Sequence, residues 1–156
     1  MRSRVGHVFM KQKLAEAGGV FGGELSGHFY FRDNFNCDSG AIAMATVLTA
    51  LAAGGKRMSE VIRPIARYPQ SGEINFQVED KDGALDELKR TYAKRGAIDE
   101  LDGVTVDCFA SEGWWCNVRK SNTEPLLRLN LEARDGATLA RMVEEVAPTL
   151  GRRVEH

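Results

Sequence analysis

The chain has 156 residues, of which 43% are hydrophobic and 28% charged, a composition typical of a soluble globular protein and unlike that of a disordered or fibrous one. Its 21 Lys and Arg residues nearly balance 22 Asp and Glu residues, so it lacks the basic surface of a nonspecific nucleic-acid or membrane binder. Three widely separated cysteines form no C-x-x-C pair, which indicates neither a disulfide framework nor a zinc site and favours the cytoplasm. The longest apolar stretch, residues 41–53, is too short to span a bilayer, and the first residues do not resemble a signal peptide.

The first part of the chain is predicted to contain three helices and two short strands. Gly18-Gly19 and Gly54-Gly55 are typical helix-ending pairs, and Asp38 or Ser39 would cap the first amides of the second helix. That helix is apolar on most sides, so we predict that it is buried. In chain order, the expected elements are a helix from Val5 to the Gly18-Gly19 pair, strands at Val20-Phe21 and Phe29–Phe31, a helix from residue 38 or 39 to the Gly54-Gly55 pair, and a short helix capped by Ser59.

A cluster of turn-forming residues from Pro69 to Gly72 separates the two parts of the chain. We predict a domain boundary there, between a domain of residues 1–70 and a domain of residues 71–156.

The second part is predicted to order its elements as strand, helix, several antiparallel strands and helix. Ile74, Phe76 and Val78 alternate with polar residues, as in a half-buried strand, and Asp102-Gly103 is a strong hairpin signal. This order predicts an α+β layer in which both helices cover one face of an antiparallel sheet. The expected elements are a strand at residues 74–79, a helix between Asp82 and Gly96, strands at residues 98–101, 104–108, 114–119 and 127–131, and a last helix that opens at Asp135.

The loop that contains Arg119, Lys120, Ser121 and Thr123 follows one of these predicted strands. A guanidinium binds two phosphate oxygens at once, and hydroxyls and turn amides satisfy the remaining acceptor directions. The combination is typical of a phosphate cradle. A plain solvated turn remains the alternative, because the same residue types are common turn formers and Glu124 would place an anion inside the proposed anion site.

A glycine-rich segment, residues 22–28, presents the carboxylate of Glu24, the hydroxyl of Ser26 and the imidazole of His28. Glycines let the backbone approach a ligand closely, and a carboxylate beside a hydroxyl suits the vicinal hydroxyls of a sugar. An imidazole titrates near working pH when nothing perturbs it, so His28 and His7 are candidate proton relays. The alternative is a hairpin with surface polar residues.

These two segments together resemble those of a known enzyme family. Gly23-Glu24-Leu25-Ser26-Gly27-His28 is similar to the sugar-binding loop of the α-D-phosphohexomutases, and residues 119–128 resemble their phosphate-binding loop in the same order along the chain. Val5-Gly6-His7 also matches a stretch of the family. The resemblance implies a partial α/β third domain over residues 1–70, followed by a TATA-binding-protein-like α+β fourth domain over residues 71–156.

The resemblance also implies a phosphomannomutase or phosphoglucomutase, which interconverts hexose 1-phosphate and hexose 6-phosphate through a phosphorylated serine and a magnesium ion. Binding of the remote phosphate positions the reacting end of such a substrate. By the resemblance, Glu24 and Ser26 would hold the sugar hydroxyls, Arg119, Ser121, Asn122 and Thr123 would clamp the phosphate that is not transferred, and His7 and His28 would line the active site as candidate proton relays.

The sequence lacks the family's Ser-His-Asn-Pro segment and its Asp-Gly-Asp-x-Asp metal loop. We therefore expect Mg²⁺ to be bound by other domains of a longer enzyme, and this chain to bind no metal and to be inactive alone. The expected partners are a hexose phosphate and the missing amino-terminal domains, but neither nucleic acid nor a membrane. A non-enzymatic phosphosugar-sensing or partner-binding module is the alternative.

Overall fold

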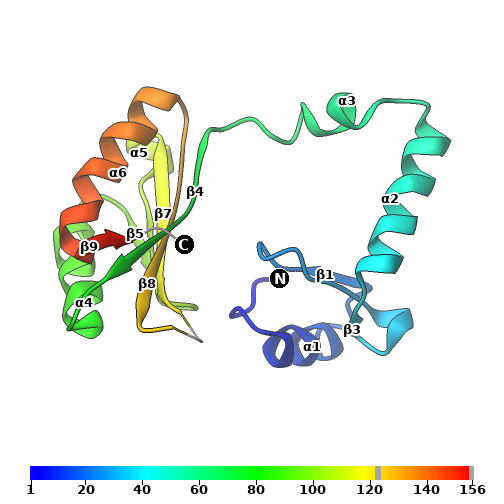
Figure 1. Cartoon of the computed structure of the whole chain (residues 1–156), viewed down its shortest axis with the longest axis horizontal. Coiled ribbons are helices and arrows are strands. Elements are labelled where there is room, and N and C mark those ends of the chain that lie inside the picture. Colours follow the sequence, from blue (N-terminus) through cyan, green and yellow to red (C-terminus); the bar gives the residue numbers. More distant parts are fainter. Residues whose placement is uncertain (122–123, 155–156) are drawn as a thin grey trace. The chain divides into compact units, whose positions relative to one another are not determined.

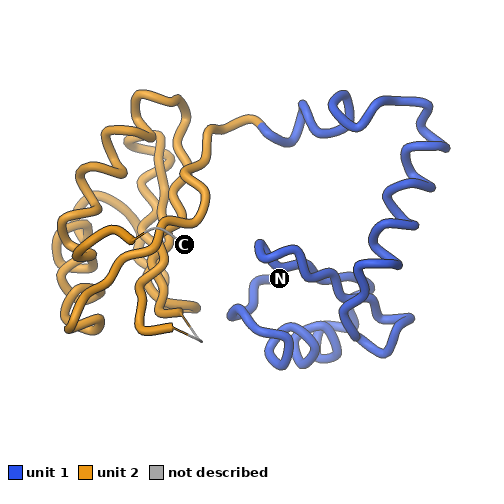
Figure 2. Tube along the Cα trace, in the orientation of Figure 1, with its two compact units in different colours: residues 1–66 blue, residues 67–156 orange. Residues whose placement is uncertain are grey.

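The computed structural model describes residues 1–121 and 124–154, whose helices and strands are labelled in Figure 1. The chain divides into two units of tertiary structure, residues 1–66 and the residues from 67 onward (Figure 2). Within the described ranges, no helix is both long enough and apolar enough to cross a membrane.

The first unit consists of three α-helices, a short 3-10 helix and a small antiparallel sheet in the order β1-β2-β3. Ser39 caps α2 by accepting a hydrogen bond from the Ile42 amide, and Gly55 ends the helix in the left-handed region at φ 60°. The elements are α1 (His7–Glu16), β1 (Phe21–Gly23), β2 (Phe29–Phe31), η1 (Arg32–Asn34), β3 (Cys37–Asp38), α2 (Gly40–Gly54) and α3 (Met58–Ile62).

The prediction that α2 is buried is wrong for this chain. None of its residues is buried, and the side chains of Met44 and Leu48 are 63% and 58% exposed. Within residues 1–66, all of which the structure describes, the buried hydrophobic side chains are Leu14 and Tyr30. The apolar sequence of α2 specified a helix that needs cover on most sides, but the elements of this unit do not supply that cover.

The prediction that Ser59 caps α3 is also wrong. The helix begins at Met58, and its cap residue is Arg57, two residues before Ser59. The backbone amide of Arg57 donates to the carboxylate of Glu60 at 2.8 Å, so the acidic residue of the first turn closes the helix start.

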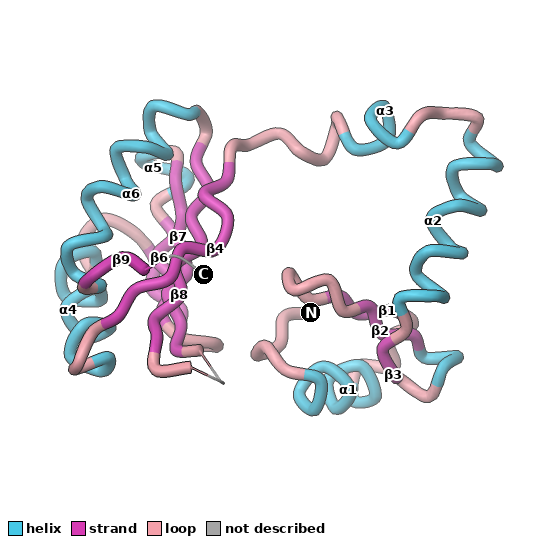
Figure 3. Tube along the Cα trace, in the orientation of Figure 1, coloured by secondary structure: helices cyan, strands magenta, loops and turns pink. Residues whose placement is uncertain are grey.

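The structure of the second unit confirms the prediction of an antiparallel sheet with two helices on one face. Its strands follow the order β5-β6-β7-β8-β4-β9, every neighbouring pair is antiparallel, and Figure 3 shows α4 and α6 on the same side of the sheet. Among the described elements of this unit, α5 and β9 were not predicted from the sequence. The elements are β4 (Gln70–Gln77), α4 (Lys81–Tyr92), β5 (Ala97–Asp99), β6 (Val104–Asp107), α5 (Phe109–Glu112), β7 (Trp114–Lys120), β8 (Leu126–Ala133), α6 (Gly136–Leu150) and β9 (Arg152–Val154).

Strict alternation along the central strands gives the sheet one apolar and one polar face. In β8, Leu127, Leu129 and Leu131 are buried against the helices, whereas Arg128 and Asn130 lie on the opposite, open face and are half-buried. β6 and β7 follow the same rule, whereas in β4 the polar-face residue Asn75 is itself buried, between Ile74 and Phe76. The open face therefore carries Glu73 and Asn75 from β4, Arg128, Asn130 and Glu132 from β8, and Asn117 and Arg119 from β7.

We expect Gly103→Ala to lower the free energy of unfolding of the second unit by about 1–3 kcal/mol, because Gly103 has φ 68° and an added Cβ would overlap the carbonyl oxygen of Val118. Gly136→Ala is the matched control, since its Cβ would meet nothing within 4 Å. Both tryptophans, Trp114 and Trp115, belong to this unit, so thermal melting followed by fluorescence reports it alone. Equal melting of the two variants would contradict this account of the turn.

We also expect backbone amides of α2 to exchange with solvent much faster than those of β7 and β8. The helix α2 belongs to a unit with few buried side chains, whereas β7 and β8 each pair with a strand on either side and pack against the core. Hydrogen exchange measured by mass spectrometry tests this. Protection of α2 equal to that of β7 would show that this chain covers the helix by itself.

Candidate functional site

The predicted phosphate cradle lies at the turn that joins β7 to β8. The amide of Ser121 donates to the carbonyl oxygen of Leu126 at 2.9 Å, and its side-chain oxygen accepts from the amide of Glu124 at 3.2 Å. Two amides that the sequence suggested were available to a ligand are therefore used inside the turn. Asn122 and Thr123, the other predicted phosphate-binding residues, lie outside the described residues.

Arg119 is the second-to-last residue of β7, and its guanidinium belongs to an ion-pair network on the open face. Its Nη2 donates to Oε2 of Glu73 at 3.1 Å, and the second oxygen of Glu73 pairs with Nη1 of Arg128 at 3.0 Å. Glu124, which the sequence placed inside the proposed anion site, pairs with Nη2 of Arg128 at 2.8 Å. The Glu124 carboxylate is therefore committed to Arg128.

An ion pair also links the end of β7, next to this turn, to the start of α4. Lys120 Nζ lies 2.6 Å from Oδ1 of Asp82, the acidic residue in the first turn of that helix. The pair is exposed, so its contribution to stability is small, but it directs the Lys120 ammonium toward the helix. Of the two basic residues at the end of β7, Arg119 is thus the one that faces the open side of the sheet.

In the first unit, the glycine-rich segment forms a tight hairpin between β1 and β2. The amide of Glu24 donates to the carbonyl oxygen of His28 at 2.9 Å, and the amide of Gly27 donates to the carbonyl oxygen of Glu24 at 3.0 Å. Gly27 has φ 86°, which suits the left-handed position of a three-residue hairpin loop. Ser26 is exposed at the tip of this loop, where the sequence predicted a sugar-binding hydroxyl.

Two hydrogen bonds orient the half-buried carboxylate of Glu24. The hydroxyl of Tyr30 donates to Oε1 at 2.5 Å, and the backbone amide of Gly6 donates to Oε2 at 2.9 Å. Burial is the largest cause that raises the pKa of Tyr30, and the hydrogen bond to the Glu24 carboxylate is the next largest. Tyr30 therefore keeps its proton and stays a donor. A carboxylate accepts about four hydrogen bonds, so sugar hydroxyls can still bind to Glu24. The Gly6 contact also brings the first residue of α1, His7, next to this segment.

His28 forms an ion pair with Asp38, a partner that sequence reasoning considered only as a helix cap. Nδ1 of His28 lies 2.7 Å from Oδ2 of Asp38, and the second oxygen of Asp38 accepts from the Phe29 amide at 2.8 Å. The hydrogen bond and charge of Asp38 raise the pKa of His28 above its usual value. Antiparallel pairing of β2 with β3 brings the two residues together, and the sequence alone gave no sign of that pairing.

The structure thus gathers the predicted residues into two groups, one in each unit. Glu24 and His28, with their partners Tyr30 and Asp38, form the first group, and Arg119 and Ser121, with the carboxylates around them, form the second. No group of three or more His, Cys, Asp or Glu side chains in residues 1–121 and 124–154 is placed to hold a metal ion.

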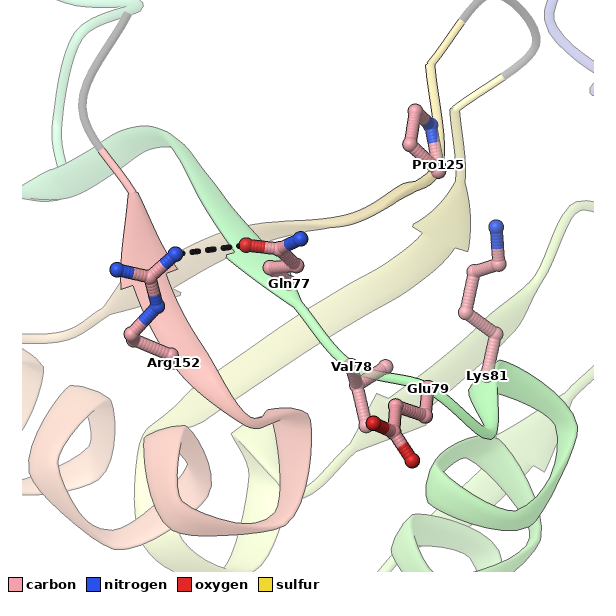
Figure 4. Close-up of a pocket in the computed structure, with 6 residues that line it drawn as sticks. All are labelled: Gln77, Val78, Glu79, Lys81, Pro125 and Arg152. Atoms are coloured by element: carbon pink, nitrogen blue, oxygen red, sulfur yellow. Dashed lines mark hydrogen bonds between the residues drawn. The ribbon is translucent and has the colours of Figure 1, made fainter.

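A separate hollow of about 450 Å³ lies beside the turn that carries Pro125 (Figure 4). Arg152 donates to the side-chain oxygen of Gln77 at 2.7 Å on one side of it, and the ammonium of Lys81 extends toward Pro125 on the other. Glu79 also lines the hollow, and its negative charge partly offsets the positive charges of Lys81 and Arg152. These two cationic side chains therefore do not by themselves make an anion site. Among the described residues, none of those predicted to bind a ligand lines this hollow.

Asp38→Asn should lower the pKa of His28 toward its ordinary value, because the anion that stabilises the imidazolium is removed. The raised pKa means that the pair stabilises the folded state below the pKa of an unfolded histidine, and that this contribution is lost as the pH rises through the folded value. An NMR titration of the His28 ring measures the shift. Asp33→Asn, at an exposed carboxylate paired with Arg32, is the control and should leave the titration unchanged. An identical His28 titration in wild type and Asp38→Asn would refute the pairing.

Comparison with known proteins assigns this chain to a family. Residues 1–68 match the family model described as phosphoglucomutase/phosphomannomutase, alpha/beta/alpha domain III, and residues 73–149 match that of the phosphoglucomutase/phosphomannomutase C-terminal domain. Tyr68 is the last residue of the first match, and the second match begins at residue 73, so the junction of the two matched domains lies between these positions.

Several curated relatives carry the name phosphomannomutase. One from Methanocaldococcus jannaschii is 42% identical over 94% of this chain and 32% of its own length, and one from Escherichia coli K12 is 37% identical over 88% of this chain and 30% of its own length. A crystal structure of a phosphoglucomutase/phosphomannomutase family protein from Burkholderia thailandensis is similar, with a TM-score of 0.75 and 27% identity over 95% of this chain and 31% of that one. The chain spans about a third of the length of these relatives. It belongs to the α-D-phosphohexomutase family, with its two parts matching the third and the C-terminal domains of phosphoglucomutases and phosphomannomutases.

Proposed function

We propose that this chain supplies the sugar-binding and phosphate-binding loops of an enzyme that interconverts hexose 1-phosphate and hexose 6-phosphate. The observation that carries the proposal is the guanidinium of Arg119 on the open face of the sheet, beside the hydroxyl-bearing turn at Ser121. The names of the relatives, phosphomannomutases and phosphohexose mutases, support a hexose phosphate as the substrate class.

At the phosphate end, Arg119 would donate charge-assisted hydrogen bonds to the phosphate that is not being transferred. Ser121, Asn122 and Thr123 would supply further donors from the same turn. Arg119 is 14% exposed, so its guanidinium approaches a ligand with little freedom to reorient. Holding the remote phosphate in this way fixes the reacting end of the substrate, which is a large part of catalysis in phosphoryl transfer.

At the sugar end, Glu24 and Ser26 would bind ring hydroxyls. Glu24 is suited to this role because Tyr30 and Gly6 fix its carboxylate in place before any ligand arrives. A preset acceptor loses less conformational entropy on binding than a mobile one.

His28 and His7 would line the active site, and His28 is the better candidate for a proton relay. Asp38 orients its ring through Nδ1 and raises its pKa, so Nε2 is the ring atom that would donate a proton to the substrate. A raised pKa keeps a larger share of His28 protonated near neutral pH, so we assign it the role of proton donor.

The phosphorylated serine and the Mg²⁺ of such an enzyme would come from domains outside the matched third of the relatives. The described residues of this chain do not fit a metal site, so this chain would bind and orient the substrate without holding the ion. Those other domains would be the partners of this chain, and the cytoplasm is the expected compartment, because three widely spaced thiols favour a reducing environment.

Arg119→Ala should weaken binding of glucose 6-phosphate or mannose 6-phosphate to this chain by at least about tenfold, because a charge-assisted hydrogen bond to the phosphate is lost. Titration of the ¹⁵N-labelled chain, followed by NMR, measures the affinity. The matched control is Arg90→Ala, which removes an exposed arginine of α4 whose partner is Glu87. Equal affinity of wild type and Arg119→Ala would exclude the turn as the phosphate site.

A further inference from the structure

Glu73 is the carboxylate that joins the two arginines of the candidate phosphate site. It lies on β4 directly after an irregularity in the pairing of β4 with β8 between Gln70 and Glu73, and such bulges redirect the side chains that follow them. One oxygen of Glu73 accepts from Arg119 at 3.1 Å, and the other pairs with Arg128 at 3.0 Å. A single carboxylate thus engages guanidinium groups from two further strands.

The two arginines differ in how strongly they depend on Glu73. Arg128 pairs in addition with Glu124 at 2.8 Å, whereas among the described residues Glu73 is the one carboxylate paired with Arg119. Arg128 also lies opposite Asn75 in the pairing of β4 with β8, but the buried Nε of Arg128 and Oδ1 of Asn75 make no hydrogen bond among those residues. Glu124 is therefore the carboxylate that would still hold Arg128 without Glu73. Loss of Glu73 would therefore free Arg119 and leave Arg128 held.

We propose that Glu73 acts as an internal substitute for phosphate at Arg119: it holds the guanidinium before a ligand arrives and competes with the phosphate group for it. The proposal rests on the phosphate site proposed above. Carboxylate and phosphate oxygens present the same acceptor chemistry to a guanidinium, so both use the same donors. Glu73 is 32% exposed, which leaves it room to turn away when phosphate takes its place.

The charges of the network support this role. Arg119 and Arg128 carry two positive charges, and Glu73 and Glu124 carry two negative ones, so the four side chains have no net charge to attract an anion. A bound phosphate would also be repelled by the nearby Glu73 carboxylate. Glu73 is thus a positioning residue that keeps Arg119 oriented, limits affinity and promotes release of the phosphate group.

Glu73→Gln keeps the size of the side chain and one hydrogen-bond acceptor but removes the charge. Titration of the whole 156-residue chain with inorganic phosphate should give a Kd about three- to tenfold lower than that of wild type, the range expected for removing one partly exposed neighbouring charge. A purely structural role for Glu73 predicts the opposite sign, because a loosened Arg119 would bind more weakly. An unchanged or higher Kd would therefore overturn the proposal.

Glu132→Gln is the matched control. Glu132 lies on the same open face, on β8, but its hydrogen bond at 3.1 Å is to Gln70. This substitution removes one negative charge, as Glu73→Gln does, but does not free Arg119. The Kd of the variant for phosphate should therefore stay within about twofold of wild type. A gain as large as that of Glu73→Gln would show a general charge effect and would overturn the proposal.

A second measurement uses the wild-type chain and so does not depend on how the variant folds. Added phosphate should move the side-chain NMR signals of Arg119 and of the Glu73 carboxyl group along the same saturation curve. Movement of the Arg119 signal with a constant Glu73 signal would refute competition but keep the phosphate site. If wild type binds no phosphate, or if Arg119→Ala binds it equally well, the proposed function itself fails at this turn.

Discussion

Burial of one face of the six-stranded sheet against α4 and α6 determines where the polar side chains of the same strands lie. Once Leu127 and Leu129 pack into the core, the pleat places Arg128 on the other face, and the antiparallel register sets Arg119 directly beside it. A shift of one residue would exchange the two faces and bury both guanidinium groups. The hydrophobic core therefore fixes the position of the candidate phosphate site, although Arg119 and Ser121 are not themselves core residues.

The two units differ in how much of their own structure they stabilise. The second has a continuous core that joins both helices to the central strands, whereas the first buries few side chains and leaves the apolar α2 exposed. Polar contacts such as Glu24 with Tyr30 and His28 with Asp38 nevertheless order the glycine-rich hairpin. Local hydrogen bonds across a short sheet thus define the sugar-binding candidates where a core is lacking.

Both groups of candidate residues share one arrangement, in which the side chains of Glu24, His28 and Arg119 are already engaged by a protein partner. Glu24 accepts from Tyr30, His28 is oriented by Asp38, and Arg119 is held by Glu73. Such partners restrict the rotamers of the binding groups, which lowers the entropy cost of binding, and for Arg119 the partner is itself an anion that competes with the ligand.

The sequence by itself determined the elements with strong local signals: the alternating strand at Ile74, the hairpin turn at Asp102-Gly103, the helix capped by Asp135, and the two motifs that resemble the phosphohexomutase loops. It did not reveal β9, whose exposed basic residues carry no apolar pattern, or the exposure of α2, since periodicity shows how much cover a helix needs but not whether the chain provides it. The partners of the site residues came only from the tertiary structure. Glu73 lies 46 residues before Arg119, and their contact exists because β4 and β7 both pair with β8, a long-range arrangement that no local pattern encodes.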